Sequence, residues 1–259
     1  MNSYHTHTFR CKHATGEVHE YVAEAMKKNS THVGITDHTP LPDNRWHSVR
    51  MRMDELEGYL LAIETAKAMY PGITVYAGLE CEYANEYASF YQDHLIGKCR
   101  LNYLIGGAHF FPFHKEWANV YEGIQTPKQL TAYADYVISS IRSGLFAFIA
   151  HPDLFANSYL RWDADAKAAS MDILSAAESC RIPLELNCYG FRKPFVSSSS
   201  GKRPAYPLEE FWALASGYQI MVVVNADAHK PDDIIANMDQ GLKLAQKYNL
   251  NVIDLSSFL

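Results

Sequence analysis

Short apolar runs recur along this chain, and amphipathic stretches separate them, which limits the folds that it can adopt. The clear runs span residues 33–36, 73–79, 103–108, 145–150, 182–187 and 220–225. Continuous apolar runs of this length are typical of strands buried on both faces, as in a parallel sheet. With a short segment that ends at Tyr4 counted as the first, the sequence predicts seven strands.

Helical patterns fill the intervals between the runs. One begins near Thr15, a candidate N-cap, and ends near Asn29, and another starts around Leu56 and is stopped by Pro71. The later candidates are residues 127–143, 166–180, 207–217 and 232–248. Regular alternation of strands and helices predicts βα units, which either close into a barrel or stay open as a doubly wound sheet.

Size and composition favour one domain. The 259 residues match the roughly 250 that a single α/β barrel needs. Because the sequence contains no internal repeat and no linker, we expect one domain over residues 1–259. The net charge of −6 disfavours broad nucleic-acid binding, which needs a basic face.

Cysteine usage and hydropathy predict the compartment. The five cysteines are odd in number and form no Cys-x-x-Cys pair, so a disulfide framework is not expected and we assign all five to the core. No basic region followed by an apolar run marks a signal peptide, and no stretch approaches roughly 18 apolar residues. The sequence therefore predicts a cytoplasmic protein without membrane attachment.

Metal-binding side chains follow the ends of nearly all the predicted strands. They are His5 and His7, Asp37 and His38, Glu80 and Glu82, His109, His151 and Asp153, and Asp227 and His229. Parallel barrels place their active sites at the rim where the strands end. His5 and His7 alternate along an extended segment, so both imidazoles can face one metal ion. We therefore expect a metal site at this rim.

Taken in order, these motifs resemble the PHP family (polymerase and histidinol phosphatase) from residue 4 to about residue 231. The family motifs are His5-x-His7, His13, Thr36-Asp37-His38, Gly78-Leu79-Glu80, Gly107-Ala108-His109-Phe110, Ala150-His151-Pro152-Asp153 and Asp227-Ala228-His229. Glu185-Leu186-Asn187, Gly190-Phe191-Arg192-Lys193-Pro194 and Tyr206-Pro207 are similar to the histidinol-phosphatase branch. The resemblance implies an α/β fold, a distorted (β/α)7 barrel of the PHP type, with a trinuclear metal centre.

The same resemblance implies three divalent ions and their ligands. The first ion would take His5, His7, Glu80 and Asp227; the second would share Glu80 and add His109 and His151; the third would take His13, His38 and His229. Imidazole and carboxylate donors suit Zn²⁺, with Fe²⁺ or Mn²⁺ as alternatives.

The implied activity is hydrolysis of L-histidinol phosphate to L-histidinol and phosphate, in histidine biosynthesis, by attack of a metal-bridging hydroxide. We expect Arg192, then Arg161 and Lys193, to bind the phosphate of this small substrate, because a guanidinium matches phosphate oxygens in a bidentate fork. Asp37 and Asp153 are catalytic candidates. Each could protonate the leaving group or, as we prefer, orient a ligand histidine.

Other interpretations stay open. A PHP-type nuclease or nucleotide phosphatase would keep the metals but change the substrate, and a long single-stranded substrate would want a basic groove. A non-catalytic domain would be expected to have lost ligands. A metal-dependent amidohydrolase would leave His13 and His229 unused. The tract Ser197-Ser198-Ser199-Ser200 is either a surface loop or a lid.

Overall fold

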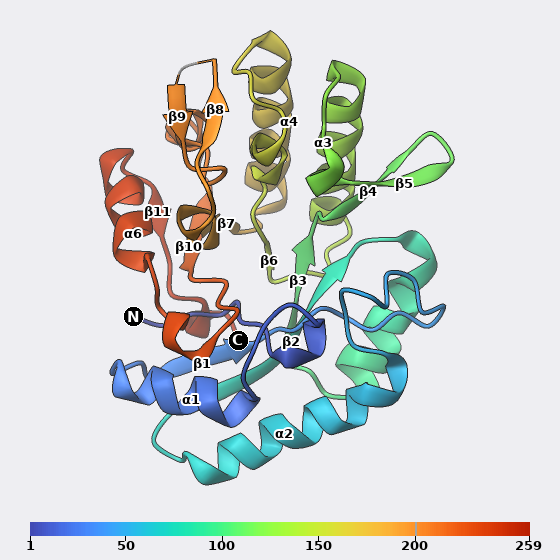
Figure 1. Ribbon diagram of the computed structural model, residues 1–259, viewed down its shortest axis with the longest axis vertical. Coiled ribbons are helices and arrows are strands. Elements are labelled where there is room, and N and C mark those ends of the chain that lie inside the picture. The colour runs from blue at the N-terminus through green and yellow to red at the C-terminus, as the bar shows by residue number, and fades with distance from the viewer. Residues whose placement is uncertain (200) are drawn as a thin grey trace.

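The predicted parallel strands form one curled sheet in the computed structural model, which describes residues 1–199 and 201–259 (Figure 1). The strand order is β1-β2-β3-β6-β7-β10-β11, and every pairing is parallel. The bounds are β1 His32–Ile35, β2 Thr74–Glu82, β3 Tyr103–Gly107, β6 Phe148–Ile149, β7 Leu184–Asn187, β10 Met221–Asn225 and β11 Asn251–Val252. The predicted α/β barrel architecture is thus confirmed.

The membership of the sheet differs from the prediction at one place. The segment before His5 makes only isolated bridges, whereas the seventh strand is β11, which the sequence analysis did not identify. The N-terminal segment still lies in the gap between β1 and the end of β10, since Gly34 N–H donates to Ser3 O at 2.9 Å and His7 N–H donates to Ala228 O at 2.9 Å. It therefore connects β1 to the chain after β10 by backbone hydrogen bonds.

Helices cover the outside of the sheet, with α1 and α2 side by side at one end and α3 and α4 packed together at the other (Figure 1). Their bounds are α1 Val18–Lys27, α2 Leu56–Met69, α3 Pro127–Arg142, α4 Ala164–Cys180, α5 Glu209–Ala215 and α6 Met238–Lys247. Two boundary predictions are wrong. Glu17, not Thr15, caps α1, and the predicted helix at 232–248 is broken by Asn237, which has φ +60°.

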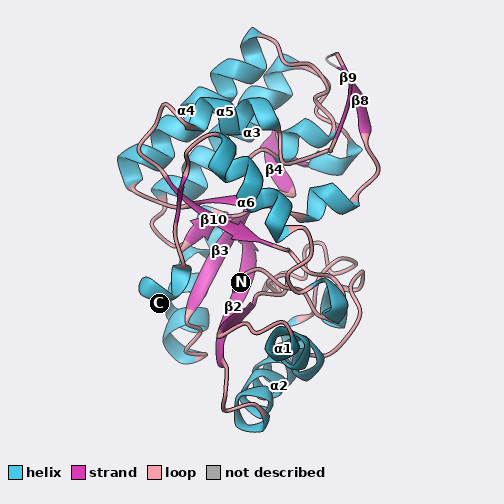
Figure 2. Cartoon of the chain, turned by 90° about the vertical axis from the view of Figure 1, so that its left-hand side faces the viewer, coloured by secondary structure: helices cyan, strands magenta, loops and turns pink. Residues whose placement is uncertain are grey.

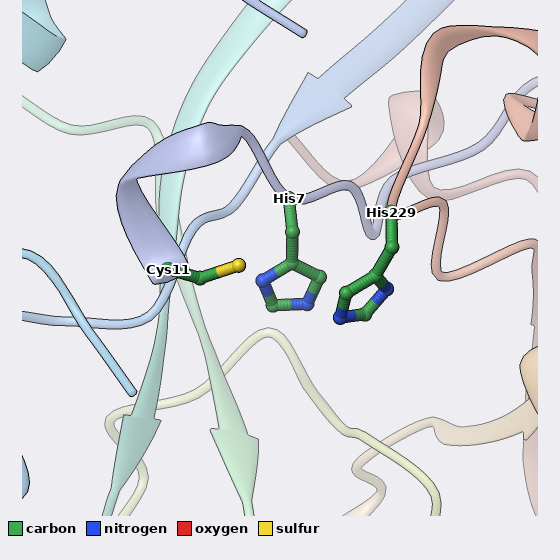
Figure 3. A group of neighbouring side chains, drawn as sticks. All are labelled: His7, Cys11 and His229. Carbon is green, nitrogen blue, oxygen red and sulfur yellow. The ribbon is translucent and has the colours of Figure 1, made fainter. Parts of the chain in front are cut away.

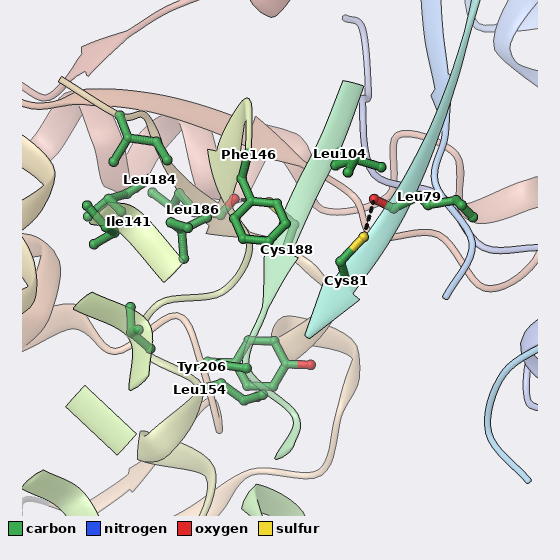
Figure 4. Packing of buried hydrophobic residues seen from close by; sticks show 14 of the residues in the cluster. Leu79, Cys81, Leu104, Ile141, Phe146, Leu154, Leu184, Leu186, Cys188 and Tyr206 are labelled. Atoms are coloured by element: carbon green, nitrogen blue, oxygen red, sulfur yellow. Dashed lines mark hydrogen bonds between the residues drawn. The ribbon is translucent and has the colours of Figure 1, made fainter. Parts of the chain in front are cut away.

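Alternation along the strands divides the core in two. Outward-facing Leu79 and Leu104 pack under the helices, where Cys81 Sγ lies 3.7 Å from Leu79 O (Figure 4). Inward-facing residues form a second cluster, which comprises Tyr4, Tyr103, Ile105, Phe148, Ala150, Val223 and Leu255. Because side chains alternate between faces, the residues that continue the inward row toward the strand ends also enter the barrel, and these are polar.

Two β-hairpins are not predicted from the sequence. The first pairs β4 Phe110–Phe113 with β5 Glu116–Asn119 (Figure 1). The second pairs β8 Val196–Ser198 with β9 Gly201–Arg203 (Figure 2). The serine-rich tract runs from β8 toward Ser200, which lies outside the described residues. A π-helical segment, Phe90–Lys98, connects β2 to β3. Within the described chain, no helix combines the length and the apolarity that spanning a membrane requires.

Candidate metal centre

Glu80, near the end of β2, faces three histidines with one of its carboxylate oxygens. Its Oε2 lies 3.4 Å from His5 Nε2, 3.5 Å from His7 Nε2 and 3.0 Å from His38 Nδ1. His5 and His7 present their Nε2 atoms 3.0 Å apart, so both rings do point to one place as their spacing predicts. A cation between these atoms would be held by imidazole nitrogen and carboxylate oxygen.

The other oxygen of Glu80 faces a second pair of histidines. Its Oε1 lies 2.9 Å from His151 Nε2 and 3.7 Å from His109 Nε2. Gly107 allows this approach, because a Cβ atom there would lie 2.8 Å from Glu80 Oε1. The carboxylate thus has one oxygen for each of two histidine groups, which is the geometry that a bridging ligand needs.

Asp227 brings the last strand end to the same place. Its Oδ1 lies 3.1 Å from His7 Nε2, 3.6 Å from His5 Nε2 and 3.5 Å from His229 Nδ1. Its Oδ2 accepts a hydrogen bond from Asn187 Nδ2 at 3.0 Å. Asp227 has φ +49°, a left-handed conformation that costs a non-glycine residue about 1–3 kcal/mol and is typical of functional sites.

The three histidines of the third expected group, His13, His38 and His229, lie beside one another. The ring of His13 lies 5.4 Å from that of His38 and 5.1 Å from that of His229, centroid to centroid. Among the described residues, three groups have ligand atoms that all lie within 4.8 Å of one another: His5, His7 and Glu80; His38, Glu80 and His109; and His7, Cys11 and His229. The structure therefore associates His38 with Glu80, and adds a cysteine beside His229.

Buried atoms without partners test whether this cluster fits a metal. Glu80 Oε2, Asp227 Oδ1 and His38 Nδ1 are buried and face the cluster, yet no hydrogen bond to a described residue satisfies them. An unsatisfied buried polar group costs about 1–3 kcal/mol, and more when it is charged. Divalent cations would satisfy carboxylate oxygens and imidazole nitrogens together, so the cluster fits them.

The charges in the cluster depend on one another. Burial would raise the pKa of Glu80, but the imidazoles of His109, His5 and His38 outweigh it and hold the pKa well below its ordinary value. Burial likewise would lower the pKa of His5, but the carboxylates of Asp227, Glu185 and Glu80 raise it well above its ordinary value. Positive charge, whether from protons or metal ions, is thus needed to keep these carboxylates ionised.

Two further carboxylates hold histidine rings from behind. Glu185 Oε1 lies 2.8 Å from His5 Nδ1, and Glu82 Oε1 lies 2.8 Å from His109 Nδ1. The far oxygen of Glu82 accepts a hydrogen bond from Arg50 at 2.8 Å, and this ion pair is almost completely buried. Such partners fix the tautomer and the direction of a ligand imidazole. No role for Glu185 or Arg50 is predicted from the sequence.

The two candidate catalytic aspartates accept hydrogen bonds that hold neighbouring segments of the chain in place. Asp37 accepts hydrogen bonds from Thr8 N at 3.0 Å and from His38 N at 2.9 Å. Asp153 Oδ2 accepts from Leu208 N at 2.6 Å and from Trp212 Nε1 at 3.0 Å. Both carboxylates are completely buried. Asp153 therefore connects the loop after His151 to the start of α5.

A cavity of about 280 Å³ opens beside the cluster. Its walls are His7, His13, His38, Val49, Arg50, His109, Phe110, Asn119, Tyr121, Tyr189, Lys193, Asp227 and His229. Lys193 Nζ lies 4.4 Å from the ring centre of Tyr189 and 5.4 Å from that of Tyr121, so two aromatic faces hold the ammonium. Of the three cations expected to bind phosphate, Lys193 is the one that lines this cavity.

The other two expected cations, Arg192 and Arg161, have different surroundings. Arg192 donates to Ala226 O at 2.6 Å and Asp227 O at 3.2 Å, so its guanidinium is committed to the backbone that carries Asp227. Arg161 has an exposed side chain beside Tyr159 and Asp163. Neither belongs to the described wall of the cavity. Sequence alone could not show that backbone carbonyls take up the donors of Arg192.

Comparison with known proteins places this centre in context. The family model described as PHP domain matches residues 3–188. A protein of Deinococcus radiodurans named probable histidinol-phosphatase is 29% identical over 237 residues, which cover 89% of this chain and 86% of that protein. A probable phosphatase of Tolumonas auensis is 25% identical over 198 residues, 75% of this chain and 66% of that protein.

Two solved structures share the fold. One, from Listeria monocytogenes and provisionally assigned as a histidinol phosphatase, has a TM-score of 0.76 at 21% identity and covers 93% of this chain and 99% of that one. The other is the histidinol phosphate phosphatase of Lactococcus lactis in complex with zinc, L-histidinol and phosphate. Its TM-score is 0.72 at 16% identity, over 97% of this chain and 95% of that one.

Proposed function

Because this chain belongs to the PHP domain family, we propose that it is a metal-dependent phosphomonoesterase that hydrolyses L-histidinol phosphate to L-histidinol and phosphate. The observation that carries the proposal is the placement of Glu80, whose two oxygens face different histidine groups. The cavity beside them has Lys193 in its wall. The relative from Deinococcus radiodurans and the ligands of the Lactococcus lactis enzyme support the choice of substrate.

The proposed ligands of three divalent ions, of which zinc is our first choice, are His5, His7, His13, His38, Glu80, His109, His151, Asp227 and His229. When bound, such ions lower the pKa of water toward about 7 and neutralise charge on a phosphoryl group. These ligands come from residues near both ends of the sequence, and the larger core cluster extends from Val18 to Ala245. We therefore treat residues 1–259 as one domain.

The other side chains of the cavity would bind and orient the substrate. Lys193 supplies a positive charge to the phosphate, in place of Arg192 and Arg161. Phe110, Tyr121 and Tyr189 offer flat apolar surfaces that suit a small heteroaromatic group such as the imidazole of histidinol. We assign positioning roles to Asp37, both of whose oxygens accept hydrogen bonds, and to Asp153, whose Oδ2 accepts from Leu208 N and Trp212 Nε1.

A substrate panel tests the proposal. The catalytic efficiency of purified protein would be compared on histidinol phosphate, an aryl phosphate, nucleoside monophosphates and a short oligonucleotide. We expect histidinol phosphate to be preferred by several orders of magnitude. Equal, slow turnover of all monoesters would refute the assigned substrate, and faster cleavage of the oligonucleotide would favour the nuclease alternative.

A lysine variant tests how the phosphate is held. Lys193→Met keeps most of the apolar contact with Tyr121 and Tyr189 but removes the charge. Loss of one charge-assisted contact costs about 1.5–3 kcal/mol, or roughly ten- to a hundredfold in kcat/KM. Lys202→Met, on β9 and outside the described wall of the cavity, is the control.

A further inference from the structure

A buried thiol lies at the edge of the candidate metal centre. Cys11 is completely buried, and its Sγ and the rings of His7 and His229 point toward one another (Figure 3). The ligand atoms of these three residues all lie within 4.8 Å of one another. We propose that Cys11 is a thiolate ligand in a subsite with His7 and His229, and that this subsite takes thiophilic ions such as Zn²⁺ or Cd²⁺ in preference to Mn²⁺ or Mg²⁺.

A short turn brings the thiol to this position. After His7, the chain makes a 3-10 turn over Phe9–Cys11, and Cys11 N–H donates to Thr8 O at 3.2 Å. Lys12 ends the turn with φ +72°. The turn reverses the chain, so the side chains of His7 and Cys11 face each other although an extended segment would carry them apart.

The histidine side of the subsite gives an independent indication of a missing ligand. His7 is 1% exposed, and its Nδ1 has no hydrogen-bond partner among the described residues. The carboxylate oxygen beside this atom, Asp37 Oδ1, is 3.6 Å away. In Figure 3 the ring of His7 lies between the sulfur of Cys11 and the ring of His229. A buried imidazole nitrogen with no partner, aimed at a thiol, is what an ion-binding position requires.

Backbone hydrogen bonds hold the three residues together. His7 N–H donates to Ala228 O at 2.9 Å, and Thr15 N–H donates to His229 O at 2.9 Å. The segment that carries His7 and Cys11 is thereby fixed on both sides of His229. The subsite is consequently built from two tied segments, and does not depend on the chance approach of a mobile side chain.

Two other buried thiols show what a core cysteine looks like in this chain. Cys81 Sγ lies 3.7 Å from Leu79 O, and Cys188 Sγ lies 3.8 Å from Leu186 O, each on a strand or directly after one. Cys11 differs because its neighbours are imidazoles. The assignment of all five cysteines to the core is wrong for the exposed Cys180 and the half-buried Cys99. Cys11 is buried as expected, but its neighbours are polar, and Cys11-x-His13 close after His5-x-His7 could have drawn attention to it.

The donor type determines which ions this subsite prefers. Thiolates favour soft or borderline ions such as Zn²⁺, whereas carboxylate and carbonyl oxygens suit Mg²⁺ and Mn²⁺. When such an ion binds, the thiol proton is released to solvent. The subsite shares His7 and His229 with the proposed phosphatase centre on which it rests, and because a neutral imidazole offers one lone pair, His7 binds either the subsite ion through Nδ1 or the first ion through Nε2. The test of the subsite does not depend on phosphatase activity.

Cadmium titration of the metal-free protein tests the proposal. The exposed Cys180 and the half-buried Cys99 are first replaced by serine, which removes the accessible thiols. In this background we expect Cd²⁺ to produce the ultraviolet absorption of a cadmium–thiolate bond, at one thiolate per chain. Adding Cys11→Ser should abolish the absorption, whereas the matched buried control Cys188→Ser should retain it. Absorption that survives Cys11→Ser, or that is absent from the background chain, would overturn the proposal.

A second measurement needs no variant, in case Cys11→Ser fails to fold. X-ray absorption of the zinc-loaded wild-type protein should show a sulfur scatterer at about 2.3 Å, the length of a zinc–thiolate bond. Scattering from nitrogen and oxygen alone would refute thiolate ligation. A sulfur signal in a protein that fails the substrate panel would instead contradict only the proposed phosphatase activity.

Discussion

The two oxygens of Glu80 serve separate histidine groups, so a change to this one side chain should disturb both. Glu80→Gln replaces one oxygen by an NH₂ group that cannot bind a cation. We expect this variant to lose two metal ions together and to lose activity, as measured by elemental analysis and turnover. Glu57→Gln, on the outer face of α2, is the control. Full metal content in Glu80→Gln would exclude a bridging role.

Gly107 affects the same carboxylate without being a ligand. A Cβ atom there would lie 2.8 Å from Glu80 Oε1 and 3.1 Å from His109 Cε1. We expect Gly107→Ala to shift the carboxylate and weaken metal binding, which can be measured by competition with a chelator. At Gly58, in α2, a Cβ atom meets nothing within 4 Å. Gly58→Ala should therefore bind metal normally and be more stable by up to about 1 kcal/mol. Equal metal affinity in both variants would contradict the prediction.

At the scale of secondary-structure elements, the buried ion pair between Arg50 and Glu82 connects the loop before α2 to the end of β2. Arg50 also donates to Thr39 O at 3.1 Å. Arg50→Met leaves the Glu82 carboxylate buried without its cation, which should cost about 3–5 kcal/mol of unfolding free energy in denaturant titrations. Adding Glu82→Leu should recover much of that stability but not metal binding, because His109 then loses its partner.

The control for this pair is Arg52→Met, since Arg52 and Asp54 form an exposed ion pair that should contribute less than about 1 kcal/mol. A loss in Arg50→Met no larger than in Arg52→Met would show that the buried pair does not stabilise the fold.

Docking of the N-terminal segment depends on Gly34 in β1. A Cβ atom at Gly34 would lie 1.9 Å from Tyr103 Oη and 2.9 Å from Tyr4 Cα. Gly34→Ala should push this segment off the sheet and carry His5 and His7 with it. We expect faster proteolysis near the N-terminus and reduced metal content. Protection and metal content equal to those of Gly58→Ala would show that the segment tolerates the displacement.

For the whole molecule, the histidine cluster makes stability depend on pH when metal is removed. Burial lowers the pKa of His7, but Asp227 and Asp37 outweigh it and raise the pKa to about 9. The stability that protonated His7 contributes to the fold is fully present below pH about 6.5 and is lost as pH rises through about 9. Burial lowers the pKa of His38 and of His229, and the positive charge of His7 lowers both further. The stability that these two neutral imidazoles contribute is therefore lost as pH falls below about 6.5.

Chelated protein should accordingly be most stable near pH 6.5, and it should lose stability both as the pH falls below that value and as the pH rises from there through about 9. Thermal melts across pH, with and without chelator, measure this. In the metal-loaded protein the loss toward high pH should disappear, because the ion takes the place of the proton. A chelated protein whose stability kept rising up to pH about 9 would contradict the assignment of His7.

The sequence predicts those parts of the structure that follow from the period of a strand. Parallel strands end at one rim, so the convergence of Glu80, His109 and Asp227 could be predicted from the order of apolar runs and polar residues alone. Contacts that depend on tertiary packing could not be predicted in this way. The donors of Arg192 go to carbonyls distant in sequence, and Cys11 reaches His7 through a turn that carries no apolar pattern. The two-residue β11 is too short to produce a periodic signal.

The N-terminal segment, fixed between β1 and the end of β10, also sets an order of events during synthesis. The proposed ligands begin at His5 and end at His229, so a ribosome makes the first long before the last. His5 and His7 emerge early and must wait for β10 before they can share an ion with Asp227. A centre built from these proposed ligands could therefore be completed only after Asp227 and His229 have been made, and a nascent chain halted before Asp227 would carry only incomplete sites.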